Sequence, residues 1–514
     1  MEGTIWSLIP PLVMILLVLL TRKVLLSLGA GIIVGALMVE SFNIVATVER
    51  IWFSFQHLFF MEGEWDIWSL QLVAFLLLLG ILIAFLTATG GAQAFGNWAV
   101  KRITTRKGSQ YTTGFLGLGI FIDDYFNSLT IGQVSRPVTD RQNVSRAKLA
   151  YLIDSTSAPV TVLTPISSWG AYIIGIIATI IATHELTNIG ALEAFIQMIP
   201  YNFYAIAAIV LVFLAVYFKL DFGPMRKHEI RAQETGELIG PNNTDVPGDL
   251  KGGVIENING KVFNLLIPIL VLLATTVTSM IVTGVQASEG EVSLVSIFAN
   301  TDVNLSLVLG GTFSVVVAML FYFVQQGEKT NFFLVTWEGI KAMLPAVYIL
   351  VLAWMIVSVI EAIGTDQYLV SLVEEANLDA AYLPLIIFLV AGVMAFATGT
   401  SWGTFGLMLP IAGSMAVALE PGLLIPALAA VLAGSVFGDH CSPISDTSVL
   451  SSTGAGSNHI DHVITQIPYA LTAAVSATIG YLALALTSSV IVGLVTTLVL
   501  LVVIVLLIKQ LIKS

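Results

Sequence analysis

Carboxylates stand in several segments of this sequence that are otherwise apolar. They are Asp123, Asp124, Asp154, Glu361, Asp439 and Asp446. When the basic residues are assigned to loops, we expect no Lys or Arg at the same depth as these acids. An unpaired carboxylate in hydrocarbon costs roughly 2.5–3.5 kcal/mol on insertion scales. Each group is therefore expected to be protonated, to face a water-filled cavity, or to be neutralised by a bound cation. A site that alternates between protonation and cation binding exchanges protons for cations.

Oxygen-bearing side chains and helix breakers surround these acids. Na⁺ is a hard cation that prefers oxygen ligands, and Pro159, Pro165 and Pro443 would free backbone carbonyls nearby. We predict a shared cation- and proton-binding site in which Asp123, Asp154 and Asp439 bind Na⁺. Its full membership is Asp123, Asp124, Asn127, Asp154, Ser155, Thr156, Ser157, Thr400, Ser401, Asp439, His440, Ser442, Ser445 and Asp446. No catalytic residue, cofactor or nucleotide-binding motif is expected, and Na⁺ enters only as a transported ion.

Simpler structural roles stay open for some of these acids. Asp123 and Asp124 would cap the second helix of a hairpin, because an Asp side chain accepts hydrogen bonds from the first amides of a helix. Asp154 and Asp446 would act in the same way, each at the start of a following helix. Two adjacent acids exceed what one cap needs, which favours a functional role for the first pair.

The histidines and one tryptophan also have alternative interpretations. Asp439 and His440 would form a structural pair, and a functional role requires that His440 faces the cavity. His459 and His462 are expected to be solvated near the cytoplasmic end of a span, with pH sensing as the alternative. Trp402 is expected in packing or as an interface anchor rather than as a ligand.

The composition is typical of a membrane protein. The chain has 514 residues, of which 57% are hydrophobic and 11% charged, against about 25% charged in soluble proteins. Runs such as 262–282 are long enough to cross a bilayer as helices, which excludes a β-barrel. We predict an all-α polytopic fold. The expected spans are 5–21, 24–39, 68–89, 161–183, 200–219, 263–284, 305–325, 342–364, 463–487 and 489–508, with less regular stretches at 110–122, 127–137, 382–416 and 422–455.

Charge placement orients these spans. With Arg22 and Lys23 inside, alternation puts most basic clusters on the cytoplasmic side, which predicts an external N-terminus and a cytoplasmic C-terminus. One re-entrant or short hairpin then turns at 123–125, and a second, entering from the opposite face, turns at 398–403. A broken helix follows each hairpin, at 154–167 and at 438–446. Two such units of opposite orientation predict the inverted-topology repeats of secondary transporters.

The domain organisation follows from these units. The segment 221–261 holds Gly, Pro, Asn and charged residues without a helical period, so it is predicted to be a linker. The net charge of −12 is expected to reside largely on external loops, including that at Glu374 and Glu375. The predicted units are 1–67 (two N-terminal spans and an external loop), 68–220 (first transport repeat), 221–262 (cytoplasmic linker), 263–341 (connecting spans), 342–488 (second transport repeat) and 489–514 (C-terminal span and cytoplasmic tail).

Three blocks of the sequence resemble a known family. They are Phe121 to Leu129 (FIDDYFNSL), Ser145 to Thr156 (SRAKLAYLIDST) and Gly438 to Thr447 (GDHCSPISDT), of which the last is the most specific. They resemble the NhaC-type sodium/proton antiporters of the ion transporter superfamily, and the likeness in layout covers about 5–509. The resemblance implies exchange of Na⁺, with Li⁺ as a further candidate, for H⁺ by alternating access in a bacterial or archaeal inner membrane. It would place the ion site at the aspartates of these blocks.

Other function classes stay open. Some members of that family exchange organic metabolites such as malate, lactate or amino acids, although no midplane Lys or Arg is available here for an organic anion. An intramembrane aspartyl protease would use Asp154 and Asp439, but its GxGD signature lacks the first Gly. A channel would need symmetry-related copies of one filter segment. The lipid bilayer, Na⁺ and H⁺ are the expected partners, a homodimer or a small organic substrate is an additional candidate, and nucleic acid is not expected.

Overall fold

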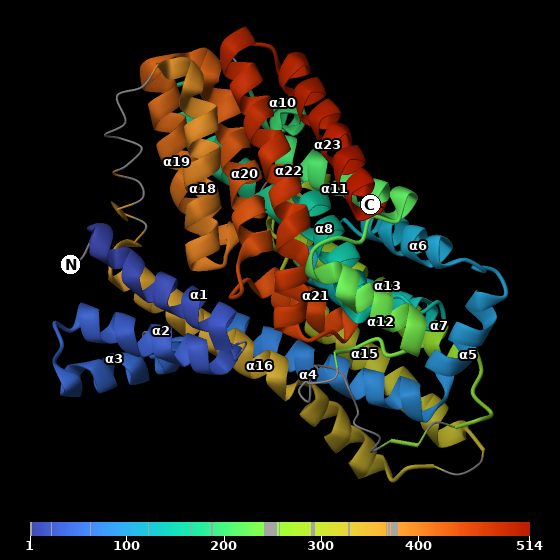
Figure 1. Ribbon diagram of the computed structural model, residues 1–514. Coiled ribbons are helices and arrows are strands. Elements are labelled where there is room, and N and C mark those ends of the chain that lie inside the picture. Colours follow the sequence, from blue (N-terminus) through green and yellow to red (C-terminus); the bar gives the residue numbers. More distant parts are fainter. Residues whose placement is uncertain are drawn as a thin grey trace.

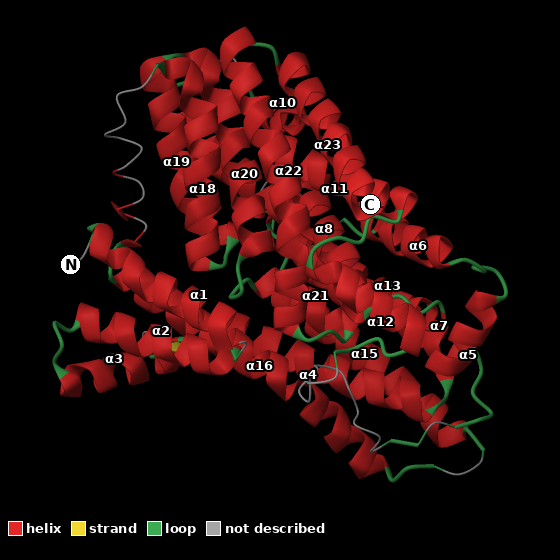
Figure 2. Ribbon diagram, in the orientation of Figure 1, coloured by secondary structure: helices red, strands yellow, loops and turns green. Residues whose placement is uncertain are grey.

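The computed structural model is built almost entirely of helices (Figures 1 and 2). It describes residues 3–513 except 22, 62, 122, 166, 187–188, 241–253, 256, 289–292, 327–328, 366, 369–370 and 372–378. Strand structure in the described part is one hairpin, in which β1 (Phe60–Met61) pairs antiparallel with β2 (Glu64–Trp65). The predicted helical fold is confirmed.

Nine of the described helices are long and apolar enough to cross a membrane, and two bent pairs raise the number to eleven if each pair is one span. The chain is therefore a multi-pass membrane protein. In the first bent pair, α8 (Arg146–Leu163) meets α9 (Ser168–Thr183) at 41°. In the second, the helical segment made of α10 (Ala191–Met198) and η2 (Ile199–Tyr201) meets α11 (Phe203–Phe218) at 52°. The nine are α4 (Ile67–Ala88), α13 (Phe263–Ala287), α15 (Val303–Val324), α16 (Phe332–Ala362), α18 (Leu383–Thr398, after η3, Ala380–Tyr382), α19 (Ser401–Leu419), α20 (Leu424–Cys441, after η4, Pro421–Leu423), α22 (His459–Thr487) and α23 (Val490–Lys513).

Shorter helices complete the fold. Near the N-terminus, α1, α2 and α3 lie beside α16 (Figure 1), with α2 and α3 in contact with it. The shorter elements are η1 (Ile5–Leu8), α1 (Ile9–Thr21), α2 (Val24–Val39), α3 (Ile44–His57), α5 (Gly91–Val100), α6 (Arg106–Gly119), α7 (Asp124–Arg141), α12 (Pro224–Thr235), α14 (Leu294–Ala299) and α21 (Asp446–Ala455).

Two large apolar clusters hold the helices together. One joins α8 to α11 with α18 to α20, α22 and α23, and includes the buried Trp169 and Phe405. The other joins α4, α5, α7, α13, α15 and α16, and includes Phe75 and Phe85. Helices α7, α8 and α21 pack against one another between these clusters. Figure 1 shows α21 in the middle of the molecule. The polar helices that carry most predicted site residues therefore lie where the two apolar bodies meet.

The contact between α7 and α21 depends on small residues. A Cβ atom added at Gly454 of α21 would lie 2.5 Å from the backbone oxygen of Ser128 in α7. A side chain there would push the two helices apart, because interiors are packed at crystal-like density and cannot absorb such an overlap. Gly454 therefore sets the close approach of two helices that each begin at predicted site residues.

Some predictions about the helices are wrong. The first broken helix is interrupted at 164–167 alone, and Asp154 to Pro159 lie inside α8, because a proline is tolerated within a membrane helix whose neighbours satisfy the freed carbonyl. The predicted linker contains the helix α12, which packs against α8 and α22. Helix α3 was not predicted, because it mixes charged and apolar residues. The rest of the linker at 241–253, together with Arg22, Glu374 and Glu375, lies outside the described residues.

Candidate functional site

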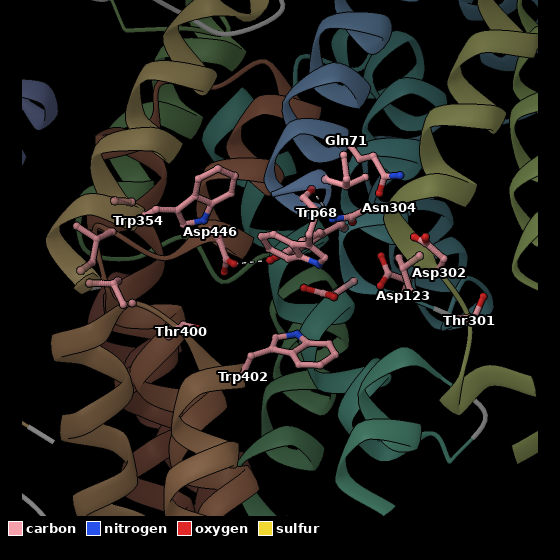
Figure 3. Close-up of a pocket in the computed structure, with 18 residues that line it drawn as sticks. Trp68, Gln71, Asp123, Thr301, Asp302, Asn304, Trp354, Thr400, Trp402 and Asp446 are labelled. Atoms are coloured by element: carbon pink, nitrogen blue, oxygen red, sulfur yellow. Dashed lines mark hydrogen bonds between the residues drawn. The ribbon is translucent and has the colours of Figure 1, made fainter. Parts of the chain in front are cut away.

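A cavity of about 670 Å³ lies at the ends of several helices. Its walls come from the first residues of α4, α7, α15 and α21, from the C-terminal half of α16, and from the turn between α18 and α19. Figure 3 shows the side chains of Asp123, Asp446, Trp68, Trp354 and Trp402 around this space. Three predicted site aspartates, including Asp124, line it, and none of the described lining residues is a Lys or Arg.

The first two aspartates differ in their hydrogen bonds. Asp123 precedes α7 as its N-cap and accepts a bond of 2.9 Å from the amide of Phe126, while its second oxygen accepts from Ser168 Oγ at 2.8 Å. Asp124 is 1% exposed, and its Oδ2 atom has no hydrogen-bond partner among the described residues. The capping role is therefore present for Asp123, whereas Asp124 lines the cavity and keeps a buried oxygen without a donor.

Asn127 lies one turn further along α7. Its amide nitrogen donates to the carbonyls of Gly117, at 2.9 Å, and Ile120, at 2.5 Å, and so ties α7 to the end of α6. Its Oδ1 atom is buried and has no partner in the described part of the chain. This orientation leaves the oxygen available as an acceptor, as the sequence-based assignment of a cation ligand requires.

Asp446 enters the cavity from the other half of the chain. It is the first residue of α21, and its Oδ2 atom accepts a hydrogen bond from the hydroxyl of Tyr125 in α7 (Figure 3). Ser445, not Asp446, is the N-cap of α21 and accepts from the amide of Ser448 at 3.1 Å. Asp446 is therefore not the N-cap, but its Oδ1 atom accepts from the amide of Thr447 at 2.9 Å, so it still bonds to the first turn of α21 as the capping alternative supposed. Its Oδ2 atom joins α21 to α7 through a residue that lies 321 positions away in the chain.

Asp439 lies behind this wall rather than on it. The side chain is fully buried in α20, and its Oδ2 atom accepts from Ser401 Oγ at 2.8 Å. Its Oδ1 atom has no partner within the described residues. Thr400, next to Ser401, is the N-cap of α19 and lines the cavity. The turn between α18 and α19 therefore connects Asp439 to the cavity wall.

Asp154 lies in a separate, fully buried cluster. Its carboxylate accepts from Ser448 Oγ at 2.9 Å, Ser451 Oγ at 3.1 Å, His462 Nε2 at 3.0 Å and Gln466 Nε2 at 2.6 Å. These donors come from α21 and α22, so the carboxylate joins three helices. It is in the middle of α8, which excludes the capping alternative. Because both oxygens already accept hydrogen bonds, they are less available to a cation than those of Asp124 or Asp439.

The remaining predicted residues are buried near these groups, and most bond to backbone or to one another. Ser157 accepts from Ser128 at 3.1 Å, and Ser128 also contacts Ser451 at 3.1 Å, which extends the cluster at Asp154 toward α7. Ser155 is buried in α8. Thr156 donates to Leu152 O at 2.8 Å, Ser442 donates to Phe396 O at 2.9 Å, and Ser445 contacts Thr447 Oγ1 at 2.9 Å.

His440 does not line the cavity. Its Nδ1 atom is 2.9 Å from the hydroxyl of Tyr204, and the side chain is 1% exposed. Asp439 bonds to Ser401 and Thr447, and no bond between Asp439 and His440 is present in the described structure. The cavity position that a functional role for His440 required is therefore absent, and the suggested structural pair is also wrong.

The aspartates do not form a metal cage by themselves. No group of three or more His, Cys, Asp or Glu side chains in the described ranges is close enough to hold a metal ion. A Na⁺ ion at the cavity would need hydroxyl, carbonyl or water oxygens to complete its shell. The chemistry that this arrangement supports is reversible binding of a small cation or a proton by cavity-facing carboxylates that have no basic neighbour among the lining residues.

Comparison with known proteins identifies the family. A model described as the Na+/H+ antiporter family matches residues 160–486. The chain belongs to the Na⁺/H⁺ antiporter family. Family membership indicates a membrane transporter rather than an enzyme, and it confirms the resemblance based on the three sequence blocks, two of which precede the matched region.

Individual relatives of this antiporter-family chain fall into two groups. An uncharacterized protein of Haemophilus influenzae is 45% identical over 97% of this chain and 94% of its own length. Shorter matches include the malate-2H⁺/Na⁺-lactate antiporter of Bacillus subtilis, 34% identical over 28% of this chain and 32% of its own length. An uncharacterized Na⁺/H⁺ antiporter of Haemophilus influenzae is 31% identical over 24% of this chain and 26% of its own.

Sequence reasoning missed several residues of this antiporter-family site. His462 and His459 are 0% and 3% exposed, so the expectation that they are solvated is wrong. His462 and Gln466, which both donate to Asp154, lie one turn apart at the start of the predicted span 463–487. That spacing is as typical of packing as of a shared hydrogen-bond partner. Trp402, expected in packing or as an interface anchor, packs against Tyr172 and also lines the cavity.

Proposed function

We propose that the protein exchanges Na⁺ for H⁺ by alternating access, and that carboxylates on and behind the cavity bind the two cations in turn. The observation that carries this proposal is the cavity wall itself, on which Asp123, Asp124 and Asp446 meet with no Lys or Arg among the described lining residues. Such carboxylates are stabilised by either a proton or a metal cation, and the two compete for the same oxygens. Li⁺, which is also a small hard cation, is a further candidate substrate.

The oxygens without donors favour particular cation ligands. Asp124 Oδ2, Asn127 Oδ1 and Asp439 Oδ1 are buried acceptors without partners in the described residues, and a buried acceptor is costly when nothing binds it. A desolvated Na⁺ would satisfy such atoms. We therefore assign Na⁺ binding to Asp124, Asn127 and Asp439 with nearby hydroxyls. Both oxygens of Asp123 and of Asp154 already accept hydrogen bonds, so we assign these two carboxylates to the support of the site or to the proton.

Alternating access needs two parts that can move against each other. We propose that the units 68–220 and 342–488 are inverted repeats that meet at the site, as in other secondary transporters. Three features support this. Helices α6 and α7 and helices α18 and α19 form paired short-turn connections, breaks follow at 164–167 and 442–445, and Asp446 of the second unit bonds to Tyr125 of the first. An inner-membrane location, with the N-terminus outside and the C-terminus in the cytoplasm, is part of the same proposal.

Exchange of an organic anion is less well supported by the cavity. The malate-2H⁺/Na⁺-lactate antiporter of Bacillus subtilis matches only 28% of this chain. A carboxylate substrate would face four aspartates on the wall without a described Lys or Arg to pair with it, and like charges in a poorly solvated space repel.

Purified protein in proteoliposomes tests the proposal. A Na⁺ gradient should collapse a pre-formed pH gradient, detected with an entrapped pH-sensitive dye, and K⁺ at the same concentration should not. The Asp124→Asn and Asp439→Asn variants should lose this activity, whereas Asp302→Asn, which removes a carboxylate from the rim of the same cavity where it caps α15, should retain it. Full activity of both site variants would refute the assignment of the site.

A further inference from the structure

The cavity is larger than Na⁺ requires. Its volume of about 670 Å³ is within the range of about 300–1,000 Å³ typical of small-molecule sites. A sodium ion with six water ligands needs roughly 180 Å³, taking about 30 Å³ for each water. The remaining space is therefore sufficient for an organic molecule of several heavy atoms.

The walls of the cavity are aromatic as well as acidic. Trp68, Trp354 and Trp402 all line it (Figure 3). The rings of Trp68 and Trp354 lie 5.9 Å apart with an interplanar angle of 51°, and Trp402 is held by Tyr172, which stacks on it at 4.6 Å. An indole attracts a cation above its ring more strongly than Tyr or Phe does, and it offers apolar surface to an organic body. A bare metal ion would not need three such rings.

The charge of the wall selects the sign of the ligand. Asp124 is 1% exposed, is one of the residues that line the cavity, and has a buried Oδ2 atom without a hydrogen-bond partner in the described chain. Asp446 lines the same space and accepts from Tyr125. A buried carboxylate oxygen without a donor has lost its water ligands and gained nothing in return, which costs free energy. The unpartnered oxygen of Asp124 is therefore stabilised by a hydrogen-bond donor or a cation.

We propose that this cavity binds a small organic cation, a primary ammonium group on a short apolar body, in competition with Na⁺. The ammonium donates hydrogen bonds to Asp124, and the apolar body lies against Trp354 and Trp402. The inference rests on the proposed function only in using the same carboxylates for Na⁺. Asn304, whose amide donates to the backbone oxygen of Trp68 at 3.0 Å, and Gln71 supply further polar groups on the wall.

The test compares three probes of the same size on the full-length protein in detergent. Butylammonium chloride, 1-butanol and potassium butyrate are titrated calorimetrically, and displacement of bound ²²Na⁺ by each is measured. We expect saturable binding of butylammonium that displaces ²²Na⁺, and neither effect with butyrate or butanol. The Trp354→Leu and Trp402→Phe variants should bind butylammonium about two- to tenfold more weakly, because each loses part of the aromatic surface against which the apolar body lies.

Controls separate the cavity from general effects. Trp337→Leu changes an exposed Trp on the same helix as Trp354, outside the cavity, and should leave binding unchanged. Trp402→Phe keeps an aromatic ring, so that a folded variant is available even if Trp354→Leu is unstable. Absence of saturable butylammonium binding, equal binding of butyrate, or binding that leaves ²²Na⁺ in place would overturn the inference.

The outcomes also separate this inference from the proposed function. If Na⁺ collapses the pH gradient in proteoliposomes but butylammonium does not bind, the inference is wrong and the proposed function stands. If butylammonium binds and depends on Asp124 and Trp354 while Na⁺-dependent exchange is absent, the cavity assignment stands and the proposed function is wrong.

Discussion

Replacing Asp154 by Asn should destabilise the folded protein, whereas the same replacement of Asp124 should not. The carboxylate of Asp154 accepts four hydrogen bonds from α21 and α22. An Asn side chain has one oxygen that accepts about two of them, and its NH₂ group faces the other donors. Hydrogen bonds to a charged group contribute about 1.5–3 kcal/mol each, so losing two costs about 3–6 kcal/mol.

The expected loss for Asp154→Asn has a lower bound. His462 Nδ1 has no partner among the described residues, so the ring can change tautomer and accept from the new amide through Nε2. That recovers one hydrogen bond and leaves a loss of about 1.5–3 kcal/mol. Asp124→Asn removes a charge whose Oδ2 atom has no donor, and its stability should equal or exceed that of the parent.

Reversible unfolding in mixed detergent micelles, followed by circular dichroism, measures both effects. We expect Asp154→Asn to unfold at a lower fraction of denaturing detergent than the parent, and Asp124→Asn to unfold at the same or a higher fraction. Of the three proteins, only the parent should carry out Na⁺-dependent exchange. Equal stability of the two variants would refute the reasoning that hydrogen bonds distinguish the buried cluster from the cavity wall.

Two further substitutions test how the helices are held. Gly454→Ala should lower the free energy of unfolding by about 1–3 kcal/mol and reduce exchange activity, because the added methyl group forces α21 away from α7. Gly175→Ala, whose added Cβ atom meets no atom within 4 Å, should change neither the melting temperature nor the transport rate. Glu229→Gln in α12 weakens the ion pair of a buried carboxylate with Arg106 and should lower the free energy of unfolding by about 1–3 kcal/mol. Glu234→Gln changes an exposed residue of the same helix and should leave the stability unchanged. Equal melting temperatures of the two variants would contradict a structural role for α12.

Spanning helices could be predicted well from the sequence because the bilayer imposes a simple rule on length and hydropathy. The predicted span 68–89 corresponds to α4 at Ile67–Ala88, and 463–487 lies within α22. The rule fails where helices are not bilayer spans. Helix α3 carries Glu49 and Arg50, and α12 is short and charged, so neither has a spanning pattern.

The site was predictable in its residue types but not in its contacts. Carboxylates without basic partners in apolar segments identified Asp124 and Asp446, and both reach the cavity. The partners of Asp154 could not be inferred, because His462 lies 308 residues away and hydropathy places it at the end of a span, where side chains are commonly solvated. Which acid has a satisfied carboxylate depends on tertiary packing, which a pattern of residue types does not encode.

The pH dependence of the apparent Na⁺ affinity tests the central claim most directly. If Na⁺ and H⁺ share the cavity carboxylates, protons compete with Na⁺ at acidic pH. The Na⁺ concentration that gives half-maximal exchange in proteoliposomes should then rise about tenfold for each unit decrease in pH per competing proton. The maximal rate at saturating Na⁺ should be retained. A half-maximal concentration that does not change with pH, with only the maximal rate changing, would contradict the account.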